Sequence, residues 1–398
     1  MQNFKRLATI TLLLAFSVQG LIVHAASGDI VEEFEVEPGG TFYLESDAGP
    51  VSVESWDRNT VRVEISNPDN FEIDLRKDGN DVVVEAESER GFLRFGRTRI
   101  SFEIGVPSEY NVDVDTGGGR IEIGTIQGRV IADTSGGAIV VERVTGGPTR
   151  LDTSGGRISV ESAEGDVEAD TSGGTIEIGD VDGSVVADTS GGDIRIGDVT
   201  GDITADTSGG DIEVGESGGR VYLDTSGGSI RAGWAIGPIT ASTSGGNIRL
   251  AGSQESVEAD TSGGNIVIER SEGPVDADTS GGSITISQAS SAVRADTAGG
   301  RIEAELAGSG ASGVGSVDLE TAGGDVRLRL PSNYSATVQA YLEVSRRARG
   351  DYRIYTDFPL AISDDDNRIR GTGDINGGGV RISLETRDSD IFIESIDN

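Results

Sequence analysis

Hydrophobic and polar positions alternate along most of this chain in short runs that are typical of β-strands. In residues 188–205, a Gly-Gly turn leads into Ile194 and Ile196, and a second turn leads into Ile203 and Ala205. Alternation with a period of two places one side of each strand in a core and the other side in water. Val, Ile and Thr dominate these runs, so the pattern predicts a pair of short strands in each such unit.

An 18-residue repeat governs the middle of the chain. Asp-Thr-Ser-Gly-Gly, or a close variant, occurs twelve times at this interval, except for one interval of 19 and one of 24. The copies begin at Asp115, Asp133, Asp152, Asp170, Asp188, Asp206, Asp224, Ser242, Asp260, Asp278, Asp296 and Glu320. The additional residues of the long interval fall in a Gly- and Ser-rich stretch, Gly308 to Ser316. A strict period of this kind indicates stacked repeats.

The two halves of each repeat have the same length, which favours a flattened, two-sided coil. An open antiparallel meander would leave an apolar face uncovered, whereas the two short sheets of a solenoid cover each other. A triangular β-helix built on hexapeptides has a coil of the same length, but it divides into three parts rather than two. We therefore predict an all-β, single-stranded β-solenoid (β-helix) with about 18 residues per coil, two short strands per coil and a cap at each end.

The flanks keep strand alternation but lose the strict period. Most aromatic residues lie in these flanks, because the chain between Asn111 and Asn333 contains only Tyr222 and Trp234. Larger core residues indicate caps that cover the open ends of the stack. The predicted organisation is a signal peptide (1–25), an N-terminal β cap with degenerate coils (26–114), regular β-solenoid repeats (115–330) and a C-terminal β cap (331–398).

The segment 1–25 has the features of a secretory signal peptide. A basic start at Lys5 and Arg6 precedes an apolar run from Leu7 to Val23, and a small-residue cleavage site ends at Ala25. The apolar run is also at the lower length limit for a membrane-spanning helix, so an uncleaved N-terminal anchor is the alternative. With cleavage we expect an exported protein without a membrane span, located in the periplasm, on the cell surface or in the medium.

Composition excludes much chemistry. Removal of the segment 1–25 takes away Lys5 and Arg6 but no acidic residue, so the net charge changes from −36 to −38, and no Cys, Met or His remains. The mature chain therefore lacks a thiolate nucleophile, a Ser-His-Asp relay and an imidazole base, and only oxygen ligands of the kind preferred by calcium or magnesium remain. The negative charge argues against nucleic acid and anionic membranes as partners. The sequence nominates no catalytic, cofactor-binding or metal-ligating residue.

Asp opens ten of the twelve repeats and is predicted to stack into a column of carboxylates. Neighbouring carboxylates repel each other. We expect each Asp to cap its own turn by accepting N–H bonds from the Ser and Gly that follow it. The alternative is calcium held between the coils. The repeat Gly-Gly-x-Ile-x-Ile, however, lacks the ligand-bearing Asp of the calcium-binding nonapeptide Gly-Gly-x-Gly-x-Asp.

The remaining repeated positions also have structural interpretations. The Gly pair (Gly191 and Gly192 in one repeat) suits a turn with positive φ and close approach of neighbouring backbones. No helix and no Lys follow the pair, which argues against a phosphate-binding loop. Thr207 and its equivalents are predicted to face inward as a hydrogen-bonded ladder, with an outward, ice-binding type of ladder as the alternative.

One outward position alternates in charge from coil to coil. Glu177, Arg195, Glu213 and Arg231 occupy the same place in four successive repeats. Stacked opposite charges resist slippage of the register and keep a sheet face soluble. We expect a solvated face that is also available for docking.

The sequence resembles a known family of bacterial β-strand-repeat proteins. The segments that carry the resemblance are Val51-Ser-Val-Glu-Ser-Trp56-Asp57, the strand ending in Val106-Pro107, the repeated Gly-Gly-x-Ile-x-Ile units and Gly377-Gly-Gly-Val-Arg-Ile-Ser-Leu-Glu-Thr386. They are similar to the bacterial "putative adhesin" family of β-solenoid proteins and to the related head GIN adhesin domains. The resemblance extends over nearly all of the mature chain. It implies a single-stranded β-solenoid at the cell envelope and brings no catalytic residues.

We therefore expect a non-enzymatic exported β-solenoid that acts as an adhesin-like or cell-envelope structural or interaction protein. Its partner would be an envelope or surface polymer or protein, or another copy of itself. A calcium-binding repeat module is the first alternative. A polysaccharide-active β-helix enzyme is the second, but such enzymes need paired carboxylates in a cleft. The acidic run Asp364-Asp365-Asp366 is expected to be a solvated loop.

Overall fold

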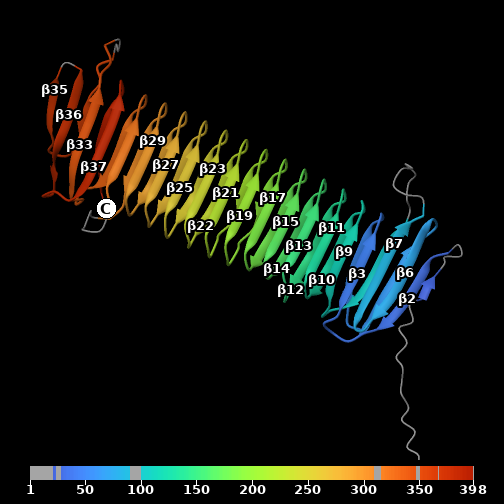
Figure 1. The fold of residues 1–398 in the computed structure, drawn as a ribbon. Helices are drawn as coiled ribbons and strands as arrows, with labels where there is room; N and C mark the ends of the chain where they lie inside the picture. Colours follow the sequence, from blue (N-terminus) through green and yellow to red (C-terminus); the bar gives the residue numbers. More distant parts are fainter. Residues whose placement is uncertain are drawn as a thin grey trace, which may run out of the picture.

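The chain folds as a long two-sheet stack of β-coils (Figure 1). This computed structural model describes residues 21–23, 28–89, 100–308, 315–346, 350–365 and 367–397, and every regular element in these ranges is a strand. The strands form one sheet of 20 and one of 18. Consecutive strands of the repeat region belong to alternate sheets, so each coil contributes one strand to each sheet. The predicted β-solenoid with two strands per coil is confirmed.

Strands of the first sheet end at the Thr of each repeat. In the repeat region they are β9 (Asn111–Thr116), β11 (Val130–Thr134), β13 (Thr149–Thr153), β15 (Val167–Thr171), β17 (Val185–Thr189), β19 (Ile203–Thr207), β21 (Val221–Thr225), β23 (Ile239–Thr243), β25 (Val257–Thr261), β27 (Val275–Thr279), β29 (Val293–Thr297) and β31 (Val317–Thr321).

Strands of the second sheet begin shortly after the Gly pair. They are β10 (Ile121–Gln127), β12 (Ile139–Thr145), β14 (Ile158–Glu164), β16 (Ile176–Asp182), β18 (Ile194–Ile196), β20 (Ile212–Val214), β22 (Ile230–Ala235), β24 (Ile248–Ser253), β26 (Ile266–Ser271), β28 (Ile284–Ala289), β30 (Ile302–Leu306) and β32 (Val326–Pro331).

Successive coils stack in parallel and in register. Ile194 pairs with Ile212 of the next repeat, and Asp188 pairs with Asp206 in the other sheet. The longest interval does not disturb this register, because Asp296 still pairs with Glu320. Within the Gly308–Ser316 stretch, where the extra residues of this interval were expected, residues 309–314 lie outside the described ranges.

Each coil contributes an aliphatic set to one continuous core. In one coil, Ile194 and Ile196 from the second sheet face Ile203 and Ala205 from the first, and all are at most 5% exposed. Val199, which the alternation did not assign, closes the core at the second turn. A buried large aliphatic contributes about 1.5–3 kcal/mol, and ordering each residue's backbone costs about 1–2 kcal/mol, so a coil depends on its neighbours.

Both caps interleave their coils rather than stacking them in chain order. The N-terminal cap contains β1 (Leu21–Val23), β2 (Ile30–Glu35), β3 (Thr41–Ser46), β4 (Val51–Trp56), β5 (Thr60–Ser66), β6 (Phe71–Asp78), β7 (Asp81–Ser88) and β8 (Ser101–Pro107). The degenerate coil β3–β4 pairs in parallel with both β9–β10 and β7–β8, so the later β7–β8 coil lies further out.

The C-terminal cap repeats this arrangement. It contains β33 (Ala336–Glu343), β34 (Ile354–Thr356), β35 (Ala361–Asp365), β36 (Arg368–Ile375), β37 (Val380–Arg387) and β38 (Ile391–Ile396). The last coil, β37–β38, pairs with β31–β32, and the earlier β33–β34 coil covers it. At each end, a Pro-Ser-x-Tyr segment joins the outer coil to the regular coils, and its tyrosine, Tyr110 or Tyr334, is fully buried.

Most of the predicted signal peptide lies outside the described residues. Within residues 1–25, only Leu21–Val23 is described, and it pairs antiparallel with β6 at the edge of the first sheet. Cleavage after Ala25 therefore stays a prediction.

The second glycine of each repeat lies directly against the preceding coil. A methyl group at Gly192 would overlap the carbonyl oxygen of Gly174, whereas one at Gly191 would find its nearest neighbour 3.8 Å away. None of the twelve Gly pairs has φ in the left-handed region. The prediction of a positive φ at these glycines was wrong. The prediction that neighbouring backbones approach each other closely there is confirmed.

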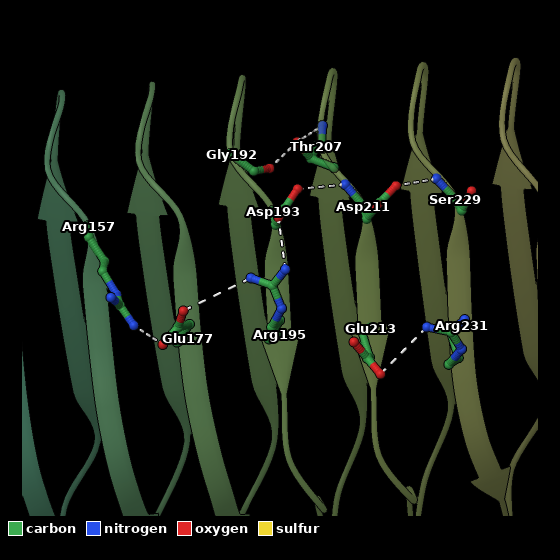
Figure 2. Close-up of polar contacts among 11 residues, drawn as sticks. Arg157, Glu177, Gly192, Asp193, Arg195, Thr207, Asp211, Glu213, Ser229 and Arg231 are labelled. Carbon is green, nitrogen blue, oxygen red and sulfur yellow. Dashed lines mark hydrogen bonds and ion pairs between the residues drawn. The ribbon is translucent and has the colours of Figure 1, made fainter.

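The same carbonyl accepts a hydrogen bond from the repeated threonine. Thr207 is 1% exposed, donates to the Gly192 carbonyl 2.9 Å away, and accepts the N–H of Gly210 at 3.3 Å (Figure 2). The inward position of Thr is confirmed. Its hydroxyl, however, bonds to the backbone of the preceding coil rather than to another Thr. This bond recurs from Thr116 in the first copy to Thr386 in the C-terminal cap.

Alanine substitutions in one Gly pair provide a matched test of this contact. We expect Gly192→Ala to lower the free energy of unfolding by roughly 1–3 kcal/mol or more, the usual cost of overpacking, because its methyl group displaces the neighbouring coil. Gly191→Ala should change it by less than about 1 kcal/mol. Urea unfolding measures both. Equal losses in the two variants would show that the close approach does not hold the stack.

Candidate interaction surfaces

A column of carboxylates runs along the outside of the first sheet. Asp188 follows the buried Ala187 and precedes the buried Thr189, so it points outward and is only partly covered. The column extends past the repeats, because Glu45 pairs with Asp115 and Glu385 with Glu320. Strand register alone places these side chains one above another.

The carboxylates of this column do not cap their turns. Within the described ranges, Asp188 and the ten other acidic residues that open repeats make no side-chain hydrogen bond or ion pair. The turn N–H that they were expected to bind is held by Thr instead, as in the bond from Gly192 to Thr189. The predicted Asp cap was wrong. Thr accepts this N–H because its inward hydroxyl lies at the turn. The neighbouring Asp points to the opposite side of the strand.

Partial burial and stacking raise the pKa of several carboxylates in the column. Partial burial, followed by repulsion from Asp170 and Asp206 of the two adjacent coils, raises the pKa of Asp188. Partial burial, followed by repulsion from Asp152 of one adjacent coil and from Glu168 of its own strand, raises the pKa of Asp170. Burial and Asp224 raise the pKa of Asp206 in the same way. In the described part of the chain, no three carboxylates converge as a cation-binding group, so the column presents a row rather than a cage.

The alternating charges on the second sheet form ion pairs between coils, as predicted. Arg195 lies 4.0 Å from Glu177, and Arg231 lies 3.7 Å from Glu213 (Figure 2). All four side chains are solvated, so each pair contributes at most about 1 kcal/mol. Their regular spacing helps to keep adjacent coils in register and leaves this face of the second sheet accessible.

A second row of polar side chains was not predicted. Asp193 accepts the backbone N–H of Asp211, and Asp211 accepts that of Ser229 (Figure 2). The row continues through Asn247 and Asn265. The sequence signal was the Asp, Ser or Asn that directly follows the Gly pair. These residues couple adjacent coils outside the core.

The second turn of the coils contains a groove, which we call the corner groove. It has a volume of about 900 Å³ and runs from Arg143 to Gln254. Carboxylates line its sides, and Trp234 and Ile236 lie at one end. Sequence reasoning found Trp234 as one of two aromatics in the repeats but did not connect it to a site. That connection needs the register that places residues from successive coils along one line.

The acidic run near the C-terminus lies at a sheet edge. Asp364 and Asp365 end β35, an edge strand that is exposed along its whole length, and Asp366 lies outside the described residues. The expected loop is therefore a strand, although its side chains are solvated as expected. Across the described ranges, the chain contains no helix long and apolar enough to cross a membrane.

Removing charge from the column should stabilise the protein. Because the pKa of Asp170, Asp188 and Asp206 is raised in the folded state, these groups destabilise the fold when ionised, and this cost disappears as pH falls towards 3.8. We expect D170N/D188N/D206N to gain on the order of 1 kcal/mol at neutral pH and to lose that advantage in acid. Thermal unfolding across pH measures this difference.

The matched control is D198N/D202N/D211N, which also removes three charges. Each of these side chains accepts a backbone N–H from the next coil, a bond that Asn retains. A gain as large as that of the column variant would attribute the effect to net charge rather than to stacking.

Comparison with known proteins finds a family match within the chain. Residues 42–232 match the Toastrack DUF4097 family model. No curated protein matches the chain. Among solved structures, a "putative adhesin" from Bacteroides fragilis is 17% identical over 55% of this chain and 98% of its own, with a TM-score of 0.32. One from Parabacteroides distasonis is 14% identical over 70% and 97%, with a TM-score of 0.29.

A "putative cell adhesion protein" from Clostridium sporogenes is 10% identical over 93% of this chain and 100% of its own, with a TM-score of 0.16. The resemblance seen in the sequence is thus confirmed by the family match. Residues 42–232 of the chain carry a Toastrack DUF4097 domain, which is a domain of repeat β proteins.

Proposed function

We propose that this protein is an exported, non-enzymatic rod of the cell envelope that acts as an adhesin-like interaction protein. The observation that carries the proposal is the uniform stacking of its surface. Residues one coil apart occupy equivalent outward positions, as Glu177, Arg195 and Glu213 do, and so form long regular rows. Such rows suit binding to an extended or repetitive partner better than binding to a small substrate.

The turns also favour binding over catalysis. The same pair of hydrogen bonds closes each first turn, as at Thr207 and Gly210, so these turns hold no long loop that could build an enclosed cleft. The corner groove is open along several coils. Glycosidases instead position two carboxylates around one scissile bond.

Export is supported by the basic and apolar segments of residues 1–25. We expect cells that produce the full chain with a C-terminal tag to place it in the periplasm, the envelope or the medium. A matched chain that lacks residues 1–25 should stay in the cytoplasm. Fractionation followed by detection of the tag measures this difference. Retention of the full chain in the cytoplasm would overturn the proposed location.

Incubation of the purified chain with a panel of polysaccharides tests the non-enzymatic part of the proposal. We expect no new reducing ends or unsaturated sugars, because the protein provides an open row of carboxylates rather than a catalytic pair in a cleft. Turnover of any polymer, lost on mutation of groove carboxylates, would favour the enzyme alternative.

Chelation distinguishes the proposed rod from a calcium-dependent module. We expect EDTA to leave the melting temperature unchanged, because the bond from Thr207 to Gly192 and the aliphatic core join the coils without a metal. Scanning calorimetry with and without EDTA is the measurement. A drop of many degrees that added calcium restores would show that folding is linked to the metal.

A further inference from the structure

The corner groove has an apolar floor built from one residue per coil. Ala163, Val181, Val199 and Ser217 line it in succession, and each is at most 4% exposed. The Ser217 hydroxyl donates to the Gly201 carbonyl at 2.9 Å, so the floor presents no free polar group there. From Arg143 to Gln254 the groove crosses six coil steps, which corresponds to about 30 Å.

Carboxylates stand along the groove at the spacing of the coils. Asp180 accepts the N–H of Asp198 at 3.1 Å, and Asp198 accepts the N–H of Glu216 at 2.8 Å. These bonds fix two of the carboxylates and leave the second oxygen of each available. The Glu216 carboxylate makes no hydrogen bond or ion pair in the described part of the chain. One side of the groove is therefore a row of negative charges, two of which are held in place by hydrogen bonds.

The opposite side adds further negative charge. Glu164 and Asp182 line it, and Asp182 is bonded to the Thr200 hydroxyl at 2.8 Å. The one cation in the lining, Arg143, is paired with Glu164 at 3.0 Å. With five carboxylates and one Arg, the lining is complementary to a cationic ligand.

The end of the groove is apolar and held in place. Ile236 is 54% exposed, and the indole of Trp234 lies close to Gly252 of the next coil. The guanidinium of Arg270 lies over the same ring, 5.3 Å from its centre. An aromatic and an aliphatic side chain at the end of an acidic row offer contact to the C–H surface of a ligand whose charged groups lie further along the groove.

We propose that the corner groove binds a linear aminosugar polymer whose amines are free and protonated. In a β-1,4-linked polymer of this kind each sugar is turned by about half a turn from the one before, so the amines on one side recur every second sugar, at nearly the rise of two coils, about 9.6 Å. The amines of the intervening sugars face the other side of the groove, where Glu164 and Asp182 lie. The side chains on one face of an extended basic peptide recur instead about every 6.6–6.8 Å, out of step with the coils. This inference rests on the proposed function and names the class of polymer that the rod binds.

Calorimetric titration of the mature chain with a fully deacetylated glucosamine hexamer, in mildly acidic buffer, tests the proposal. We expect binding that weakens with added salt, and at least roughly tenfold weaker binding of the N-acetylated hexamer, which lacks the charges. D198N/E216Q should weaken binding of the deacetylated hexamer by at least about tenfold. W234A should weaken it without any change in charge.

The matched control is D170N/D188N, which removes two charges from the outer face of the first sheet. It should retain the affinity of the original chain. Equal losses in both double variants, equal binding of the two hexamers, or tighter binding of an alternating Lys-Ala peptide than of the glucosamine hexamer would overturn the proposal. So would the absence of binding. An absence of binding would not affect the proposed export and envelope location, because fractionation tests these independently.

Discussion

The carbonyl of the second glycine in each repeat is the contact on which the rest of the structure depends. The Gly174 carbonyl accepts the hydroxyl of Thr189 at 2.9 Å and lies against the bare backbone of Gly192. Both partners belong to the next coil, so this contact sets where the next coil sits. One atom thereby explains two repeated residue types, Thr for the hydrogen bond and Gly for the space.

A fixed spacing of coils has consequences for every outward position. Identical residues are placed above one another whether or not they attract, which is why Asp170, Asp188 and Asp206 form a repelling column. The stack tolerates this repulsion because the aliphatic core and backbone ladders hold adjacent coils. Where signs alternate, as at Glu177 and Arg195, the same spacing produces ion pairs. Surface chemistry is therefore read along rows rather than within single coils.

The sequence predicted those features that repeat with the period. The coil length, the two sheets, the inward Ile194 and the stacked charges follow from alternation and from the regular interval. The predicted Asp cap was wrong because Asp and the neighbouring Thr could both accept the same turn N–H. Which of them does so depends on the side of the strand to which each side chain points. The interleaved caps were also beyond prediction, since nothing in the chain order indicates that β37–β38 lies inside β33–β34.

The corner groove shows a second limit of sequence reasoning. Its carboxylates, Asp180, Asp198 and Glu216, are ordinary solvated residues in their own coils and become a site only as a row. The groove further depends on the placement of Trp234 beside a glycine of the next coil. Neither relation is visible until the register is known, because each joins residues one repeat apart.

Thermal unfolding of two deletion variants tests the stacking unit most directly. Removing residues 188–205 deletes one whole coil and rejoins Ala187 to Asp206, its normal type of neighbour. We expect this variant to keep the strand content per residue and to melt within a few degrees of the original. Removing only residues 188–196 places first-sheet residues against second-sheet residues and should abolish cooperative folding. Comparable stability of the two variants would contradict a stack built from coils of one repeat each.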